Sequence, residues 1–245
     1  MISNDPFHEE RRKAEMLNRK RGERAEHVSN WYFRLNGFLS IPGFVVHPDT
    51  PKRYPLTEAD LIAVRFPNSG EVIGERSMVD DSLLTSMANG QQKLFLLVEV
   101  KLDLCKINGP WSDPVAGNMQ RVINRLGFAK VESVDHIAQQ MYAGLRWEDE
   151  ETVLQYVSVG QRINDGLQRS YPKLRQITWD QISDFLFNRF KQFPGKLLDD
   201  GRSVHEQWPD FGRRFGKGLR RMSSVQDARE FVRQYIEGDA KVLAP

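Results

Sequence analysis

The chain of 245 residues contains a single cysteine, Cys105, and this scarcity excludes two kinds of protein. One thiol cannot form an internal disulfide, so the chain is not a secreted scaffold held together by disulfides. One thiol also cannot build a cysteine-rich metal cage. We therefore expect a protein of a reducing compartment, and the predicted location is cytoplasmic.

Long apolar runs are missing as well. The longest uninterrupted aliphatic or aromatic run is Leu94 to Val98, whereas a membrane-spanning helix needs about 20 such residues. Residues Met1 to Lys13 carry charges where a signal peptide would be apolar. No membrane role is expected.

A large excess of charge of one sign is the third absence, because 35 Lys and Arg against 33 Asp and Glu leave a formal net charge of +2. This balance excludes a uniformly basic, histone-like binder of nucleic acid. The charges are nevertheless unevenly distributed, since bases gather at 11–24 and 213–221 and acids at 148–151. The small net charge is therefore compatible with a basic contact face and an acidic centre.

Apolar residues, by contrast, make up 40% of the chain, enough to form a buried core. Their spacing predicts a helix where they recur with a period of about 3.6 residues, and a strand where they alternate or form short runs between turn residues. The predicted elements are a helix at 7–36, strands at 43–46, 59–66 and 94–101, a long insertion at 68–92 with a helical turn at 82–88, helices at 115–126 and 134–145, and a strand at 152–159. This order predicts a mixed sheet with helices on its faces.

Two capping-box patterns predict helices in the last third of the chain. Thr178 and Gln181 precede one apolar pattern of helical spacing. Ser223 and Gln226 precede another. The C-terminal third is therefore expected to be mostly helical.

Together these elements predict an α/β fold in two parts. Residues 1–165 form a mixed sheet flanked by helices, and residues 166–245 form a helical C-terminal subdomain. A chain of this length fits one elaborated domain with an appendage better than two equal domains.

Charged residues interrupt two of the predicted strands. Leu94 to Val98 leads directly into Glu99 and Lys101, and Asp60 precedes another apolar run. Because an unpaired charge in a core costs several kcal/mol, these groups require partners. A period of two places Glu99 and Lys101 on one face of their strand, and Glu58 and Asp60 on one face of theirs. If the two strands pair, the four charged groups converge at one end of the sheet.

Carboxylates gathered in this way suit a hard cation such as Mg²⁺, which Asp and Glu oxygens bind together with water and phosphate oxygens. Such a metal polarises a phosphate and lowers the pKa of bound water. Lys101 beside it would orient or deprotonate the attacking water, or stabilise the charge that develops on the phosphorane. The pattern indicates hydrolysis of phosphodiesters.

These residues resemble the PD-(D/E)xK, or restriction-endonuclease-like, nuclease superfamily. Glu26 lies on the first helix, Asp60 on the second strand and Glu99-Val100-Lys101 on the third. The local sequences at 57–63 and 97–101 are similar to the pattern in archaeal Holliday-junction resolvases and related small endonucleases.

The resemblance implies a restriction-endonuclease-like fold and cleavage of DNA that depends on Mg²⁺ or Mn²⁺. It implies that Asp60 and Glu99 are metal ligands, and that Lys101 is the catalytic lysine. It also implies an auxiliary acidic role for Glu26, and Glu58 is a candidate further ligand. RNA as a substrate and assembly into a homodimer stay open.

The resemblance covers residues 23 to about 159 and departs from the family pattern in two ways. Ala59 precedes Asp60, so the proline and the acid named by the motif are not adjacent here. A long insertion also separates Asp60 from Glu99. The helical C-terminal third has no counterpart in the minimal nuclease.

Simpler interpretations of the same residues remain. Glu99 and Lys101 form a pattern that also occurs on solvated strand edges, where the two charges pair with each other. Glu26 is equally interpretable as a surface acid of its helix that pairs with Arg24 or Arg34. A nuclease-fold protein that binds nucleic acid or a protein partner without cutting is the alternative to an enzyme.

Basic residues suggest where nucleic acid is contacted. The stretch 211–221 mixes bases with aromatic residues and glycines and contains no acid, which favours phosphate contacts, although an ordinary solvated basic loop explains it equally well. Gln120 and Arg121 are further candidates, with an exposed polar helix face as the alternative. The candidate nucleic-acid contacts in the basic stretch are Arg213, Arg214, Lys217, Arg220 and Arg221. The bases between Glu9 and Arg24 are interpreted as a solvated helix surface.

Overall fold

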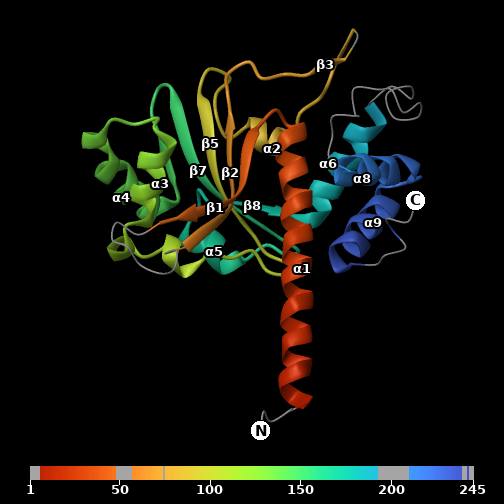
Figure 1. Cartoon of the computed structure of the whole chain (residues 1–245). Helices are drawn as coiled ribbons and strands as arrows, with labels where there is room; N and C mark the ends of the chain where they lie inside the picture. The colour runs from red at the N-terminus through yellow and green to blue at the C-terminus, as the bar shows by residue number, and fades with distance from the viewer. Residues whose placement is uncertain (1–5, 48–56, 74, 193–209, 239–241, 243–245) are drawn as a thin grey trace.

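The structure, a computed structural model, describes residues 6–47, 57–73, 75–192, 210–238 and 242. Its centre is a mixed β-sheet with helices on both faces (Figure 1). The strands are β1 (Leu39–Val46), β2 (Thr57–Arg65), β3 (Val72–Ile73), β4 (Arg76–Ser77), β5 (Lys93–Val100), β6 (Arg146–Glu148), β7 (Thr152–Gly160) and β8 (Arg175–Thr178). The helices are α1 (Pro6–Leu35), α2 (Ser82–Thr85), α3 (Asn118–Leu126), α4 (Val134–Gly144), α5 (Asp165–Ser170), α6 (Trp179–Gln192), α8 (Asp210–Arg221) and α9 (Val225–Glu237), with short 3₁₀ turns at Gly109–Trp111, Pro114–Ala116 and Val131–Ser133.

The main sheet has the strand order β1-β2-β5-β7-β6, with β8 also paired to β7. β1 and β5 are both antiparallel to β2, and β6 is antiparallel to β7, whereas β7 runs parallel to both β5 and β8. α3 and α4 lie in the connection between β5 and β7, as a parallel pair requires a crossover. The predicted mixed sheet is confirmed, and β6 and β8 are strands that the sequence pattern did not reveal.

The sheet separates two hydrophobic clusters. Alternate side chains of β5 point to opposite faces, so Leu96 and Val98 pack under α1, α6, α8 and α9, whereas Phe95 and Leu97 pack under α3 and α4. Figure 1 shows these two groups of helices on opposite sides of the strands. β5 and β7 are buried on both faces, which explains their nearly continuous apolar sequences.

α1 is the predicted N-terminal helix, and it ends before Gly37, whose φ of +78° suits a glycine. Its C-terminal half is anchored in the core through Ala25, Val28 and Tyr32. Residues 9–20 are all exposed, and this half projects beyond the body of the protein (Figure 1). The helix therefore has an anchored half and a projecting half.

The stretch 211–221, interpreted from its sequence as either a phosphate-contacting patch or an ordinary solvated basic loop, forms most of α8. Its glycines pack against aromatic rings: a Cβ would lie 2.0 Å from Trp31 at Gly212, 2.5 Å from Phe190 at Gly216 and 2.3 Å from Phe231 at Gly218. Burial of Phe215 and Leu219 between them outweighs the low helix propensity of glycine. These glycines therefore serve close helix packing and leave no flexible loop for phosphates.

The start of α9 also differs from the prediction. Its cap is Ser224 with Asp227, one residue beyond the expected pair of Ser223 and Gln226. The Ser224 hydroxyl accepts from the Asp227 backbone N–H at 3.1 Å, and the Asp227 carboxylate accepts from the Ser224 backbone N–H at 3.0 Å. A carboxylate in the first turn also interacts favourably with the helix dipole, which favours this register.

The C-terminal part is helical, as predicted, and shares a core with the sheet. The cap of α6 by Thr178 and Gln181 is confirmed, with the Gln181 side chain accepting from the Thr178 backbone N–H at 2.7 Å. One hydrophobic cluster contains residues of β5, α1, α6, α8 and α9. The division at residue 165 stays a prediction. Over the described ranges, no helix is long and apolar enough to cross a membrane.

Candidate active site

Strand pairing brings Asp60 and Glu99 together, as the sequence predicted. The antiparallel register of β2 and β5 ends at the pair Leu61 and Val98, so Asp60 and Glu99 follow at the same end of the two strands. The Asp60 carboxylate then takes the place of the next backbone partner, because its Oδ2 accepts from the Val100 N–H at 2.6 Å. Asp60 is thus fixed toward β5.

Glu99 is almost completely buried, with 1% of its surface exposed. Its Oε1 forms an ion pair with the Lys101 ammonium, and its Oε2 accepts a hydrogen bond from the Tyr156 hydroxyl at 3.3 Å. Burial and the nearby charge of Asp60 raise the pKa of Glu99 to about 7, against the opposing effects of Lys101 and Tyr156. The second carboxylate of the site is therefore held from two sides and easily protonated.

Opposing effects also act on the pKa of Asp60. Burial raises the pKa of its carboxyl group above the ordinary value, whereas the Val100 N–H and the positive charge of Lys101 oppose that shift. The charge of Glu58 adds to the upward shift. Two crowded carboxylates and one ammonium thus share the end of β2 and β5.

Glu26 faces this pair from α1. Burial is the largest cause that raises its pKa to about 7, followed by the charges of Asp60 and Glu58, with smaller effects of Glu23 and Glu99. The surface pairing considered for Glu26 is not formed within the described part of the chain, since Arg24 donates to the Ile236 carbonyl at 2.9 Å and Arg34 lies over the Trp31 ring.

Glu58 lies on the outer side of the site. It is exposed, and a Cβ at Gly43 on β1 would lie 3.0 Å from its Oε1. Gly43 has a φ of +61° and lies opposite Asp60, between the pairs Pro42–Leu61 and Phe44–Ala59. The predicted convergence therefore holds for Asp60, Glu99 and Lys101, with Glu58 turned toward the edge strand.

The donor chemistry of these residues fits a hard divalent cation. Mg²⁺ is typically held by one or two carboxylates, with water and phosphate oxygens completing its octahedron, and Asp60 and Glu99 supply such oxygens. Burial, and after it the neighbouring negative charges, raise the pKa values of Glu26 and Glu99, and a bound cation would oppose both effects by favouring the charged carboxylates. Within the described ranges, no group of three or more His, Cys, Asp or Glu side chains is already arranged to hold a metal.

Gln120 and Arg121 on α3 serve their local structure. The Tyr142 hydroxyl donates to the Gln120 carbonyl oxygen at 3.3 Å, and the Arg121 guanidinium donates to the Ala116 carbonyl at 2.5 Å. Their proposed contact with nucleic acid stays a prediction.

The basic residues of α8 are partly accessible. Arg214, Lys217 and Arg221 are exposed, and Arg220 is half-buried. The side chain of Arg213 lies outside the described part of the chain. A role of these residues in binding phosphates likewise stays a prediction.

Tyr156 is the site residue that sequence reasoning missed. It lies on β7, is fully buried, and places its hydroxyl against Glu99. Its only signal in the sequence is a phenol in the middle of an otherwise buried strand, where a hydroxyl needs a partner. A tyrosine in such a strand is more often an ordinary core residue.

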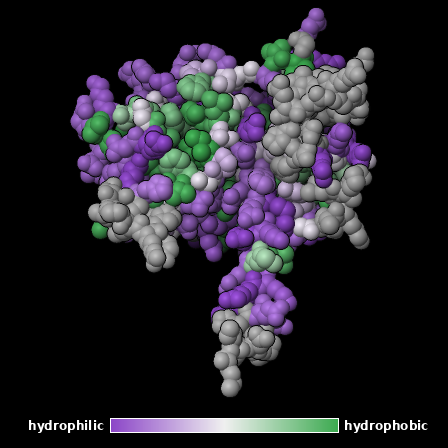
Figure 2. Space-filling model, viewed as in Figure 1, coloured by the Kyte–Doolittle hydropathy of each residue, from purple (hydrophilic) through white to green (hydrophobic). Residues whose placement is uncertain are grey.

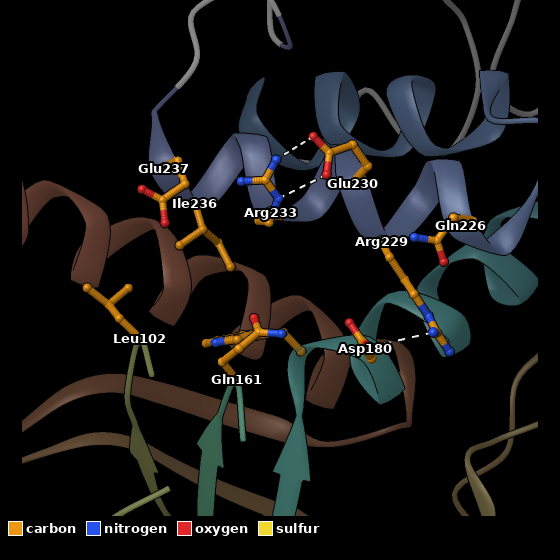
Figure 3. Close-up of a pocket in the computed structure, with 10 residues that line it drawn as sticks. Leu102, Gln161, Asp180, Gln226, Arg229, Glu230, Arg233, Ile236 and Glu237 are labelled. Carbon is orange, nitrogen blue, oxygen red and sulfur yellow. Dashed lines mark hydrogen bonds and ion pairs between the residues drawn. The ribbon is translucent and has the colours of Figure 1, made fainter. Parts of the chain in front are cut away.

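A separate cavity of about 280 Å³ lies beside the carboxyl ends of β5, β7 and β8, between α6 and α9 (Figure 3). Its charged side chains pair with one another: Arg233 binds Glu230 at 2.5 Å, and Arg229 lies 3.5 Å from Asp180. Neither Asp60 nor Glu99 lines it. Because its charges are already compensated, this cavity is a weaker candidate than the acid pair.

Comparison with known proteins assigns no function to this site. We find no match to this chain among protein-family models, curated proteins or solved structures. The resemblance to PD-(D/E)xK nucleases thus rests on Glu26, Asp60, Glu99 and Lys101 and on the order of their elements, and it stays a prediction.

Proposed function

We propose that the protein is a metal-dependent endonuclease that hydrolyses phosphodiester bonds of DNA within a restriction-endonuclease-like fold. The observation that supports the proposal is the convergence of Asp60, Glu99 and Lys101 at one end of the paired strands β2 and β5. Two crowded carboxylates beside a lysine are costly for stability, and such costs are typical of functional sites.

Asp60 and Glu99 would hold Mg²⁺ or Mn²⁺, which when bound polarises the phosphate and lowers the pKa of a water molecule. Asp60 is oriented for this role by the Val100 N–H, and Glu99 by the Tyr156 hydroxyl. Both ligands are therefore fixed by groups from neighbouring strands before any ligand arrives.

Lys101 is the group that contacts the substrate. Its side chain is 29% exposed, so the ammonium lies at the rim of the site with access to solvent. A bound phosphate offers oxygens to this ammonium, which then stabilises the negative charge that develops during attack. In the structure, the same ammonium compensates Glu99.

Glu26 is proposed to act as the auxiliary acid. A carboxyl group with a pKa of about 7 exchanges protons readily near neutral pH, which suits general acid or base catalysis. From α1, it lies within range of the charges of Asp60 and Glu58.

The proposal is tested by incubating the purified protein with plasmid, single-stranded and branched DNA in the presence of Mg²⁺ or Mn²⁺. We expect cleavage of at least one substrate, loss of cleavage in Asp60→Ala, and unchanged cleavage in Asp135→Ala, which alters an exposed acid on α4. No cleavage of any substrate, or equal cleavage by both variants, would contradict the proposal.

A binding protein that does not cut is the second candidate. It is favoured by the ion pair of Lys101 with Glu99 and by the finding that no three-residue metal group is arranged among the residues described. Calorimetric titration with Mn²⁺ separates the two. An endonuclease takes up Mn²⁺ and loses this uptake in Asp60→Asn, whereas the non-cutting protein shows no uptake.

A further inference from the structure

The projecting half of α1 begins where the helix passes the acid pair. Glu26 lies within range of the charge of Asp60 and, more weakly, of Glu99, and the helix continues N-terminally from this point, away from the core. At about 1.5 Å per residue, the exposed residues 9–20 extend over about 18 Å. Figure 1 shows this half of α1 extending beyond the sheet toward the N-terminus.

The core of the protein does not require this projecting half. Burial on α1 begins at Ala25, and every described residue from 9 to 20 is exposed to solvent. Two ion pairs within the helix, Lys13–Glu9 and Arg19–Glu23, are themselves exposed and contribute little to stability. Because isolated helices of about 12 to 15 residues are marginal in water, this exposed segment adds little to the stability of the fold.

Its charge is not balanced. Between residues 9 and 20 it carries the bases Arg11, Arg12, Lys13, Arg19 and Lys20 and the acids Glu9, Glu10 and Glu15. Figure 2 shows a mostly hydrophilic surface on the projecting half. Residues near the anchored half are already engaged, since Arg21 pairs with Glu237 at 2.5 Å and Arg24 donates to α9.

Three bases of the projecting half lie outside its ion pairs. Within the described ranges, those pairs are Lys13–Glu9 and Arg19–Glu23, so Arg11, Arg12 and Lys20 form none. Arg12 precedes Glu26 by about four helical turns and therefore lies on nearly the same face of α1. An arginine is thus aligned with the residue that marks the acid pair.

We propose that the projecting half of α1 is a contact surface for the phosphate backbone of duplex DNA bound at the acid pair. The inference rests on the proposed function for its substrate. Duplex DNA carries about one negative charge per 1.7 Å, so about ten charges pass beside 18 Å of helix. Unpaired guanidinium and ammonium groups on an exposed helix bind such a backbone without reading its sequence.

The test is binding of a fluorescein-labelled duplex of about 40 base pairs, measured by anisotropy in EDTA between about 50 and 200 mM salt. The test variant is Arg11→Gln/Arg12→Gln/Lys20→Gln, because glutamine has a helix propensity close to those of Arg and Lys. We expect binding at least about tenfold weaker, and a salt dependence whose slope falls by about 1 to 2, because Arg11 and Arg12 lie on the side of α1 that bears Glu26 whereas Lys20 lies on another side. Circular dichroism checks that the helix content is unchanged.

The matched control is Arg76→Gln/Arg125→Gln/Lys130→Gln, which removes the same charge from exposed positions on β4, α3 and the loop after α3. We expect this control to bind like the wild type. Equal losses in both triple variants, no loss in the α1 variant, or no duplex binding by the wild type would overturn the inference.

The proposed function fails by a different result. Binding in EDTA needs no cleavage, so binding that depends on the α1 bases without cleavage refutes the enzyme and retains the contact surface. If the protein cleaves DNA but its binding is unchanged in the α1 variant, the proposed enzymatic function stands and the contact surface is refuted.

Discussion

At the scale of single residues, the site is a set of charges held by neighbours that do not react. Val100 orients Asp60 through a backbone N–H, and Tyr156 orients Glu99 through its hydroxyl. Lys101 compensates one carboxylate, while Glu26 has no such partner among the residues that the structure describes and has a pKa of about 7. The site is therefore poised between protonation and binding of a cation.

Tyr156→Phe tests the positioning of Glu99. The hydroxyl lowers the pKa of Glu99, so its removal is expected to raise that pKa and to shift the acidic limb of the pH–rate profile of cleavage to higher pH. At neutral pH we expect a loss of rate of about threefold to tenfold, since the hydrogen bond is long. Tyr142→Phe is the control, because this hydroxyl bonds to Met119 and Gln120 and leaves the profile unchanged.

Glu26→Gln tests the raised pKa of Glu26 through stability. The folded-state pKa of about 7 exceeds the ordinary 4.5, so the folded protein binds more protons between these values and its unfolding free energy falls as the pH rises through them. We expect the variant to match the wild type near pH 4.5 and to exceed it at pH 8 by about 1 kcal/mol, a value reduced for solvent screening. Urea denaturation at both pH values measures this difference.

The surface acid Glu132 provides the control for that experiment, since it is exposed on the turn before α4. Glu132→Gln is expected to change stability equally at both pH values. A Glu26→Gln protein that is no more stable than the wild type at pH 8 would show that the Glu26 charge is well solvated.

At the scale of elements, the packing of α8 reverses an ordinary helix rule. Replacing glycine by alanine normally stabilises a helix by about 1 kcal/mol. In α8, however, the added Cβ of Gly216 would lie 2.5 Å from Phe190, and the ring is fully buried. The glycine therefore lowers the helix propensity of α8 but allows its close contact with α6.

Gly216→Ala and Gly22→Ala are expected to have opposite effects. We expect Gly216→Ala to lower the unfolding free energy by about 1 to 3 kcal/mol through overpacking. Gly22 lies on α1 with no neighbour within 4 Å of an added Cβ, so Gly22→Ala should raise it by about 0.5 to 1 kcal/mol. Denaturant titration of both variants measures the signs, and stabilisation by Gly216→Ala would show that α8 does not pack as described.

Much of this arrangement is predictable from the sequence, because long elements with strong periodicity carry their own signal. The strands β2 and β5 and the charges that end their apolar runs identify Asp60, Glu99 and Lys101 in advance. β8 has only four residues and lies directly before α6, which leaves too short a pattern to recognise. The glycines of α8 suggest a loop because their aromatic neighbours, such as Trp31 and Phe231, are distant in sequence.

The contacts around the site also divide into features that the sequence pattern predicts and features that depend on how distant segments pair. A charge within an apolar strand signals that it needs a partner, but the identity of that partner depends on which strands pair. Tyr156 becomes a neighbour of Glu99 only through the parallel pairing of β5 and β7. The backbone N–H of Val100 carries no sequence signal at all.

At the scale of the whole molecule, the net charge of +2 is an average over unlike regions. Acidic groups concentrate where β2 and β5 end, and bases outnumber acids by five to three on residues 9–20, the half of α1 that projects from the same region. α6, α8 and α9 anchor the other half of α1 by sharing its hydrophobic cluster. The fold thus holds an acidic centre rigidly and presents a basic helix beside it.

The most direct test of the central claim is the rate of Mg²⁺-dependent DNA cleavage in Lys101→Ala and Lys93→Ala. The two lysines lie just beyond one end and at the other end of the same strand, β5, and each pairs with a glutamate. The account predicts a loss of about 100-fold to 1,000-fold in Lys101→Ala, as for removal of a group that stabilises transition-state charge, and an unchanged rate in Lys93→Ala. Equal rates in the two variants, or a wild-type protein that cleaves no DNA, would contradict it.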